Sequence, residues 1–183
     1  GEVVVTPAGQ RVTLWGITPR GQLHAADIEA GEAVLDKSFD PGRVGLSVLQ
    51  HTLDIQLLEI VAKQYGWQDW VQGDRLGKWV AGQSRPDIIA THPSGERWAL
   101  EVERTIKTTR RYCVILADRL QAIRRGDFTR VVWLTPTPGE AVRLAALIKS
   151  ITTVIVAGQS VQIVPERHHA GLMFHDFAAF PSL

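Results

Sequence analysis

Two long segments of the chain have the spacing of apolar residues that predicts helices. Residues 46–66 form a predicted helix that ends at Gly66, a residue type common just after a helix C-terminus. Residues 108–127 carry apolar side chains every three to four positions. We therefore expect two helices in the middle of the chain, each with a buried and an exposed face.

Shorter segments between and after these helices predict strands. Residues 85–92 and 97–104 flank the turn-forming sequence HPSGE and predict a β-hairpin, while 68–72 and 130–136 predict two further strands. The predicted order over residues 46–135 is helix, strand, strand, strand, helix, strand. Such an order indicates the α/β class, with a mixed sheet covered by helices on both faces.

The chain before residue 46 is different in character. Residues 3–5 and 11–17 flank a turn and predict a β-hairpin, and a linker around residue 40 is expected to follow. The sequence LWGITPRGQ resembles the wing of a winged-helix domain, so a winged-helix remnant and a plain hairpin are both open. The predicted domains are residues 1–40 and 41–183. After residue 136 we expect a helix from Pro138 and short strands between 152 and 165.

Composition narrows the class of protein. With 45% hydrophobic and 21% charged residues, the 183-residue chain is typical of a soluble globular protein. No apolar run is long enough to cross a bilayer, so no membrane insertion is expected. The single cysteine, Cys113, excludes an internal disulfide and favours a cytoplasmic location. The net charge of +1 means that any affinity for nucleic acid must come from a local basic patch.

The predicted hairpin contains acidic residues among the apolar residues of its strands. Alternation places Glu101 and Glu103 on one face of their strand, and pairing through the HPSGE turn brings Asp87 opposite residues 101–102. A half-exposed face of the hairpin is one interpretation. The other is that the three carboxylates, which would repel one another, share a divalent cation with oxygen ligands.

The residues that follow favour the second interpretation. Arg104, Lys107, Arg110 and Arg111 come directly after the acids. Carboxylates that hold a cation, beside cations that can hold phosphate, are the arrangement expected for metal-assisted phosphodiester chemistry.

The pattern of Pro86-Asp87, thirteen intervening residues and Glu101-Val102-Glu103 resembles the signature of the PD-(D/E)XK, or restriction-endonuclease-like, nucleases. The predicted order of helices and strands is also that of their αβββαβ core. The sequence departs from the signature at its lysine, which is Glu103 here. Lys107 is the candidate for a displaced lysine.

The sequence EVERTIKTTRRY is further similar to the motif of the plasmid mobilisation protein C relaxases and replication-relaxation proteins, which also place a winged helix before the nuclease core. This resemblance implies a metal-dependent DNA nickase that cuts one strand at a plasmid transfer origin. Its implied partners are DNA and a conjugative coupling protein.

The resemblance also implies roles for individual residues. Asp87 and Glu101 would bind Mg²⁺ or Mn²⁺, helped by the Val102 carbonyl. Glu103 would add a ligand or orient the attacking water, and Lys107 would stabilise charge on the scissile phosphate. The residues implied to contact DNA are basic: Arg85, Arg104, Arg110 and Arg111.

Three more side chains are candidates for the cleft. His51 and Asp54 lie on the polar start of the predicted inner face of the first helix, and a His–Asp pair at this spacing is the alternative. Tyr112 is either a nucleophile or, at helical spacing with Leu116, a core residue. Arg124-Arg125 would complement a helix C-terminus or contact phosphate, and His168-His169 would be solvated or bind metal. The alternative function is an inactive restriction-endonuclease-like protein that binds DNA as a replication or transcription accessory.

Overall fold

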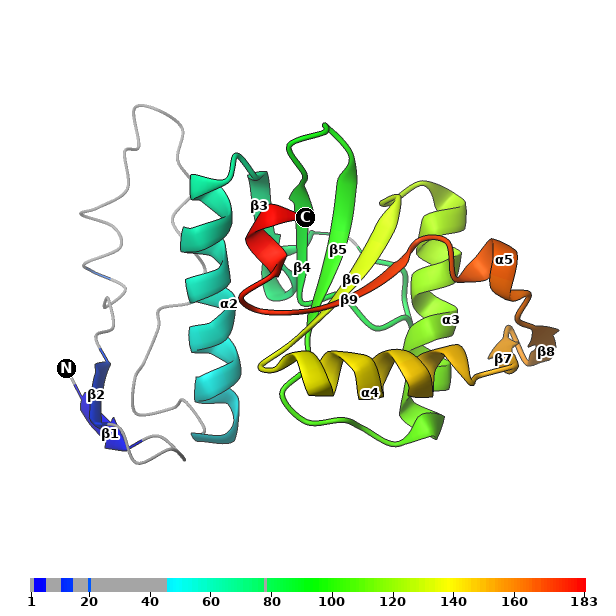
Figure 1. The fold of residues 1–183 in the computed structure, drawn as a ribbon, viewed down its shortest axis with the longest axis horizontal. Helices are drawn as coiled ribbons and strands as arrows, with labels where there is room; N and C mark the ends of the chain where they lie inside the picture. The colour runs from blue at the N-terminus through cyan, green and yellow to red at the C-terminus, as the bar shows by residue number, and fades with distance from the viewer. Residues whose placement is uncertain (1, 6–10, 15–19, 21–45, 78) are drawn as a thin grey trace. The chain divides into compact units, whose positions relative to one another are not determined.

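The computed structural model describes residues 2–5, 11–14, 20, 46–77 and 79–183, and the chain divides into two units, Gly1–Leu53 and Asp54–Leu183 (Figure 1). In the first unit β1 (Glu2–Val5) pairs antiparallel with β2 (Arg11–Leu14), as the predicted hairpin requires. The remainder of the wing-like sequence and the linker near residue 40 lie outside the described residues. Helix α2 (Leu46–Gln64) begins in this unit and continues into the second.

The second unit is built on a five-stranded mixed sheet. Its strand order is β3 (Gln68–Gln72), β4 (Ile88–Thr91), β5 (Arg97–Val102), β6 (Arg130–Thr135) and β9 (Leu172–Asp176). Strands β3, β4 and β5 are antiparallel neighbours, whereas β6 is parallel to β5 and β9 is parallel to β6. The predicted α/β class and mixed sheet are confirmed, and α2, β3, β4, β5, α3 and β6 follow the predicted order.

Helices and a hairpin fill the connections. After the 3₁₀ turn η2 (Gly73–Arg75) the chain returns to β4, and α3 (Thr109–Arg125) connects β5 to β6. Helix α4 (Pro138–Lys149), the β7–β8 hairpin (Thr153–Val156 and Gln159–Gln162) and the short α5 (Pro165–His168) lead to β9. The chain ends in the 3₁₀ turn η3 (Phe180–Ser182). None of the helices described is long and apolar enough to cross a membrane.

Capping hydrogen bonds define both ends of α3, the helix that contributes most to the site. The Thr108 hydroxyl accepts a hydrogen bond from the Arg111 N–H and so satisfies a donor in the first turn of α3. The helix ends at Gly126, whose φ of 82° is favourable for glycine, and the N–H of Gly126 donates to α3 carbonyls. Both boundaries lie within two residues of the predicted ones.

The two faces of the sheet belong to two hydrophobic clusters. Ala99, Val131 and Trp133 pack with buried residues of α3 and α4, such as Leu116 and Leu144. On the opposite face, the residues that pack with the second-unit part of α2 and with Phe180 are Ile88, Ala90, Trp98, Leu100, Val102, Val132 and Leu134. Residues of β5 therefore alternate between the clusters, as the pleat of a strand requires.

Two features differ from expectation. The predicted inner face of the first helix, which starts with His51 and Asp54, continues in the sequence through Leu57. In the structure Leu57 is 60% exposed, and the buried positions of α2 are Ile55, Leu58 and Ala62 at helical spacing. The tail after His168, which no sequence pattern assigned, supplies the edge strand β9 and the buried Phe180.

Candidate active site

Asp87 lies one residue before β4, beside the end of β5. Ile88 is opposite Leu100 in the antiparallel pairing, so the next position brings Asp87 alongside Glu101, as the sequence predicted. The Oδ2 atom of Asp87 accepts a hydrogen bond of 2.8 Å from the backbone N–H of Val102. The predicted strand over 85–92 is shorter in the structure, because Pro86 has no N–H to give to a ladder.

The backbone before Asp87 is packed tightly against the turn that follows β3. The N–H of Gly73 donates to the Asp87 carbonyl at 2.7 Å. A Cβ atom on Gly73 would lie 2.1 Å from the Pro86 carbonyl oxygen, a distance that backbone atoms cannot accept without moving. Gly73 is therefore part of the support that holds Asp87 in place.

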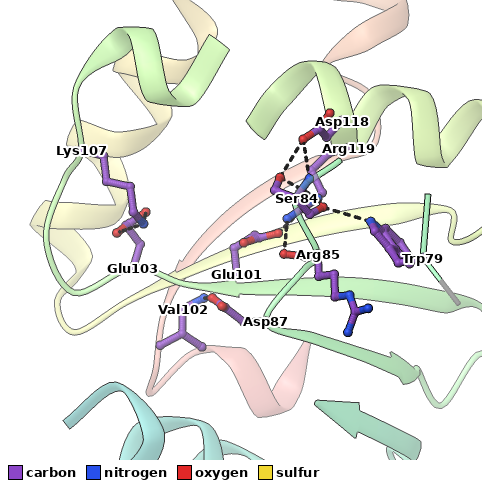
Figure 2. A network of polar contacts seen from close by, with 10 residues as sticks. All are labelled: Trp79, Ser84, Arg85, Asp87, Glu101, Val102, Glu103, Lys107, Asp118 and Arg119. Carbon is purple, nitrogen blue, oxygen red and sulfur yellow. Dashed lines mark hydrogen bonds and ion pairs between the residues drawn. The ribbon is translucent and has the colours of Figure 1, made fainter. Parts of the chain in front are cut away.

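Glu101 is the penultimate residue of β5, and its side chain is buried under α3. Its Oε1 atom accepts a hydrogen bond from the Nε atom of Arg119, which forms a buried ion pair with it, and Figure 2 shows the two groups with Asp87 nearby. Burial, opposed by Arg119 and aided by the charge of Asp87, raises the pKa of Glu101 to about 7. The site thus contains a carboxyl group that titrates near neutrality.

Arg119 is the main residue that sequence reasoning missed. It is only 1% exposed, and besides Glu101 its guanidinium donates to the carbonyls of Ser84 and Arg85 at 2.7 and 2.8 Å. The neighbouring Asp118 accepts hydrogen bonds from the Ser84 N–H and hydroxyl, both at 2.8 Å. Helix α3 therefore fixes the segment that leads to Asp87 as well as the Glu101 side chain (Figure 2).

The sequence does contain an indication that α3 carries buried, paired ionisable residues. The Asp118-Arg119 pair interrupts the apolar positions of the helix predicted over 108–127, and ionisable residues on a buried helix face are rare unless they are paired. What the sequence could not provide is the partner, because Ser84 and Glu101 are distant along the chain.

Glu103 and Lys107 form the other half of the cluster. The Lys107 Nζ atom donates to both Glu103 carboxylate oxygens, at 2.6 and 2.5 Å, and Glu103 is buried. The Lys107 charge also lowers the pKa of Glu101, opposing the effect of burial. The structure thus brings Asp87, Glu101, Glu103 and Lys107 together, with Lys107 on the side of Glu103 (Figure 2).

Tyr112 lies beneath this cluster rather than on its surface. The side chain is fully buried, and its hydroxyl accepts a hydrogen bond of 3.1 Å from the Lys107 N–H. Burial raises the pKa of the Tyr112 phenol, and the Glu103 charge raises it further. Tyr112 thus belongs to the hydrophobic core, and a buried phenol of raised pKa is a poor nucleophile.

The predicted DNA-contacting arginines have different surroundings. Arg104 pairs with Asp54 of α2 at 2.5 Å, and the Nη1 atom of Arg85 donates to the Gly73 carbonyl at 3.3 Å. Arg110 and Arg111 are exposed on the first turn of α3 and form no ion pair with another described residue.

The two predicted cleft residues of α2 have separate outcomes. Asp54 is buried and is paired with Arg104, which belongs to the segment just after β5. His51 is half-buried and lies in the first unit, so its expected position beside the carboxylates stays a prediction.

The donor set that could hold a cation consists of two carboxylates. Among the residues the structure describes, no three His, Cys, Asp or Glu side chains form a group suited to a metal ion. Asp87 and Glu101 are near enough for the charge of one to raise the pKa of the other. Mg²⁺ commonly uses one or two carboxylates and completes its shell with water and substrate phosphate, so this pair suits it.

Comparison of the chain with protein families, with characterised proteins and with solved structures finds no significant match.

Proposed function

We propose that the second unit is a divalent-metal-dependent DNA endonuclease that nicks one strand, of the type that acts at a plasmid transfer origin. The observation that carries this proposal is the Asp87–Glu101 pair, in which burial and mutual repulsion raise the pKa of Glu101 to about 7. A perturbed carboxyl group beside a second acid is typical of functional sites. The motif around Glu101-Val102-Glu103 and the order of α2, β3, β4, β5, α3 and β6 support the same proposal.

Asp87 and Glu101 would hold Mg²⁺ or Mn²⁺, with the Val102 carbonyl as a further oxygen ligand. Such an ion would polarise the scissile phosphate and lower the pKa of an attacking water. Its positive charge would also favour the ionised form of Glu101, because an opposite charge lowers the pKa of a carboxyl group.

In this proposal Lys107 is the residue that acts on the substrate phosphate. Its side chain is 44% exposed, while its partner Glu103 is buried, so solvent reaches part of the Lys107 side chain. In this proposal the ammonium group stabilises negative charge on the phosphate, and Glu103 keeps the side chain at the edge of the site. Glu103, which stands at the signature's lysine position, would in this way hold Lys107, four residues later in the chain.

The start of α3 offers a surface for the DNA backbone. Arg110 and Arg111 are exposed there, although cations at a helix N-terminus oppose the helix dipole. Two arginines and the positive end of a helix together attract phosphate. In this proposal they hold the strand that is cut.

A plasmid nicking assay tests the proposal. With Mg²⁺ or Mn²⁺ we expect conversion of supercoiled plasmid to nicked circles, with breaks that map to one strand. Asp87→Asn should lower the rate by about a hundredfold or more, since the amide oxygen keeps the hydrogen bond from Val102 but loses the charge. Asp74→Asn, which changes an exposed acid in η2, is the matched control and should leave the rate unchanged.

Metal binding gives a second readout that does not depend on the DNA sequence. Mn²⁺ should raise the melting temperature of the unaltered chain and of Asp74→Asn, but not that of Asp87→Asn. If Mn²⁺ changes none of these temperatures and no nicked circles form, the endonuclease proposal fails.

One observation favours the alternative of an inactive DNA-binding protein. Glu101 is paired with Arg119 and Glu103 with Lys107, so the acids already have cationic partners within the chain. An inactive protein would bind DNA through Arg110 and Arg111 with no effect of Mn²⁺ on its melting temperature. The two experiments above separate these functions.

A further inference from the structure

A cavity of about 740 Å³ lies at the end of the sheet away from the carboxylates. It opens between the C-terminal half of α3, the β7–β8 hairpin and α5, beside Glu96 and Arg130 at the starts of β5 and β6. Asp87 and Glu101 lie at the other end of β5 and do not line it. Cavities of 300–1,000 Å³ are typical of sites for small organic ligands.

The inner surface of this cavity is mainly apolar. Leu120 and Ile123 of α3 face it from one side, and Val154, Val161 and Ile163 of the hairpin region face it from the other. Ile163 and Val154 belong to the buried cluster, whereas Val161 is 38% exposed. An apolar ligand would therefore contact a wall that is continuous with the core.

Basic side chains also line the cavity, and two of them are uncompensated. Arg124 and Arg167 form no ion pair with any residue in the described part of the chain. By contrast, the lining residue Arg130 lies 3.5 Å from Glu96, the one acidic residue of the lining. The cavity thus has a net positive charge.

His168 adds a hydrogen-bond donor to this lining. Its Nδ1 atom accepts a hydrogen bond of 2.8 Å from the Val164 N–H. In the neutral ring the proton is then on Nε2, which can donate to an anion.

We propose that this cavity binds a small amphipathic organic acid. The apolar body of the ligand contacts the walls formed by α3 and the hairpin, and its anionic group pairs with Arg124 and Arg167. A nucleic acid strand is a less suitable ligand, because the apolar walls offer neither hydrogen bonds nor positive charge to its phosphate groups. The site is separate from the carboxylate pair and does not depend on the endonuclease proposal.

Calorimetric titration of the full chain with decanoate and with its neutral counterpart decanol tests this proposal. We expect decanoate to bind with one-to-one stoichiometry, roughly tenfold or more tightly than decanol, because only decanoate can use the guanidinium groups. The double change Arg124→Gln and Arg167→Gln should remove this preference and leave decanol binding unchanged. Arg143→Gln, an exposed arginine of α4 outside the cavity, is the matched control and should keep the preference.

Methyl chemical shifts locate the bound probe. Decanoate should shift the methyl signals of Ile123, Val154 and Ile163, and leave those of the exposed Leu57 and Ile60 of α2 in place. The proposal is overturned by equal affinity for decanoate and decanol, by an unchanged preference in the double variant, or by the absence of saturable binding below about 1 mM. None of these outcomes bears on plasmid nicking, which is measured separately.

Discussion

Glu101 combines burial, a neighbouring acid and a buried cationic partner in one side chain. Burial dominates, so the pKa of this carboxyl group is raised from its ordinary value of 4.5 to about 7 even though Arg119 opposes the shift. A group with a raised pKa binds its proton more tightly in the folded than in the unfolded chain. Its contribution to stability is therefore complete below pH 4.5 and is lost as the pH rises through about 7.

The first residue-scale prediction compares Glu101→Gln with the unaltered chain. The amide of the variant stays neutral, so in metal-free buffer the free energy of unfolding of the unaltered chain should fall relative to the variant as pH rises from 4.5 to 8. The shift from 4.5 to about 7 corresponds to a change on the order of 3 kcal/mol. Urea denaturation across this pH range measures it. Parallel profiles for the two proteins would show that Glu101 is not perturbed.

A second prediction concerns Arg119. Arg119→Met leaves Glu101 buried without its partner and the Ser84 and Arg85 carbonyls without a donor, so it should lower the free energy of unfolding by about 3 kcal/mol or more at pH 8. In the double variant with Glu101→Leu, part of this loss should be recovered. Urea denaturation of the unaltered chain, the two single variants and the double variant gives the interaction free energy of the pair. The control, Arg111→Met on the exposed surface of α3, should change stability by less than about 0.5 kcal/mol. Strict additivity of Arg119→Met and Glu101→Leu would rule out a direct pair.

At this scale the sequence predicted some residues and not others. The positions of Asp87, Glu101 and Glu103 followed from strand alternation and from the HPSGE turn, since both are local properties. The role of Arg119 depends on how α3 lies over β5, and the pairing of Arg104 with Asp54 joins segments fifty positions apart. Local periodicity contains no information on such contacts.

The C-terminal segment shows the same limit at the scale of elements. Helices α2 and α3 and strands β3 to β6 were predicted because their periodicity and end signals are local. Strand β9 has five residues, and among the described strands its one partner is β6, about forty positions earlier, so its existence depends on a long-range contact. Parallel pairs also lack the tight turn that identifies a hairpin in a sequence.

The segment after β9 closes the α2 face of the sheet. The Phe180 ring is fully buried, 4.9 Å from the Trp67 ring between centroids, and the His92 Nε2 atom donates to the Leu183 carbonyl at 2.8 Å. Phe180 also belongs to the cluster of Trp98 and Leu100. Phe180 is therefore part of the core, and the partly buried Leu183 packs against the same cluster.

We predict that Phe180→Ala lowers the free energy of unfolding by about 3–5 kcal/mol, because it leaves a cavity among aromatic rings. Thermal unfolding followed by tryptophan fluorescence measures the loss. Val164→Ala, a substitution at an exposed apolar residue, is the control and should have an effect below about 0.5 kcal/mol. Equal losses for the two variants would contradict the assignment of the C-terminal segment to the core.

Over the whole molecule, positive charge is nearly balanced by negative charge, with a net charge of +1. Binding of DNA would then depend on where unpaired cations gather. Near the carboxylates, Arg104, Lys107 and Arg119 are held in ion pairs, while Arg110 and Arg111 are exposed and form no ion pair with another described residue. A phosphate contact is therefore expected at the start of α3.

The prediction at this scale is a change in the salt dependence of DNA binding. Arg110→Gln with Arg111→Gln should weaken binding to duplexes of any sequence and reduce the slope of log K against log salt by about 2, one unit for each lost phosphate contact. Fluorescence anisotropy between low and physiological salt measures the slope. Arg143→Gln on α4 should leave it unchanged, and an unaltered slope in the double variant would place the DNA surface elsewhere.

The close approach at Gly73 limits how this protein can vary through evolution. With the Pro86 carbonyl 2.1 Å from any Cβ at position 73, a mutation there to another residue displaces the backbone beside Asp87. In a related chain that keeps the same turn and the same acid, the position equivalent to 73 should still be glycine, even where the surrounding surface has diverged. A related chain that has lost the acid at position 87 would no longer need glycine at position 73, so positions 73 and 87 should change together.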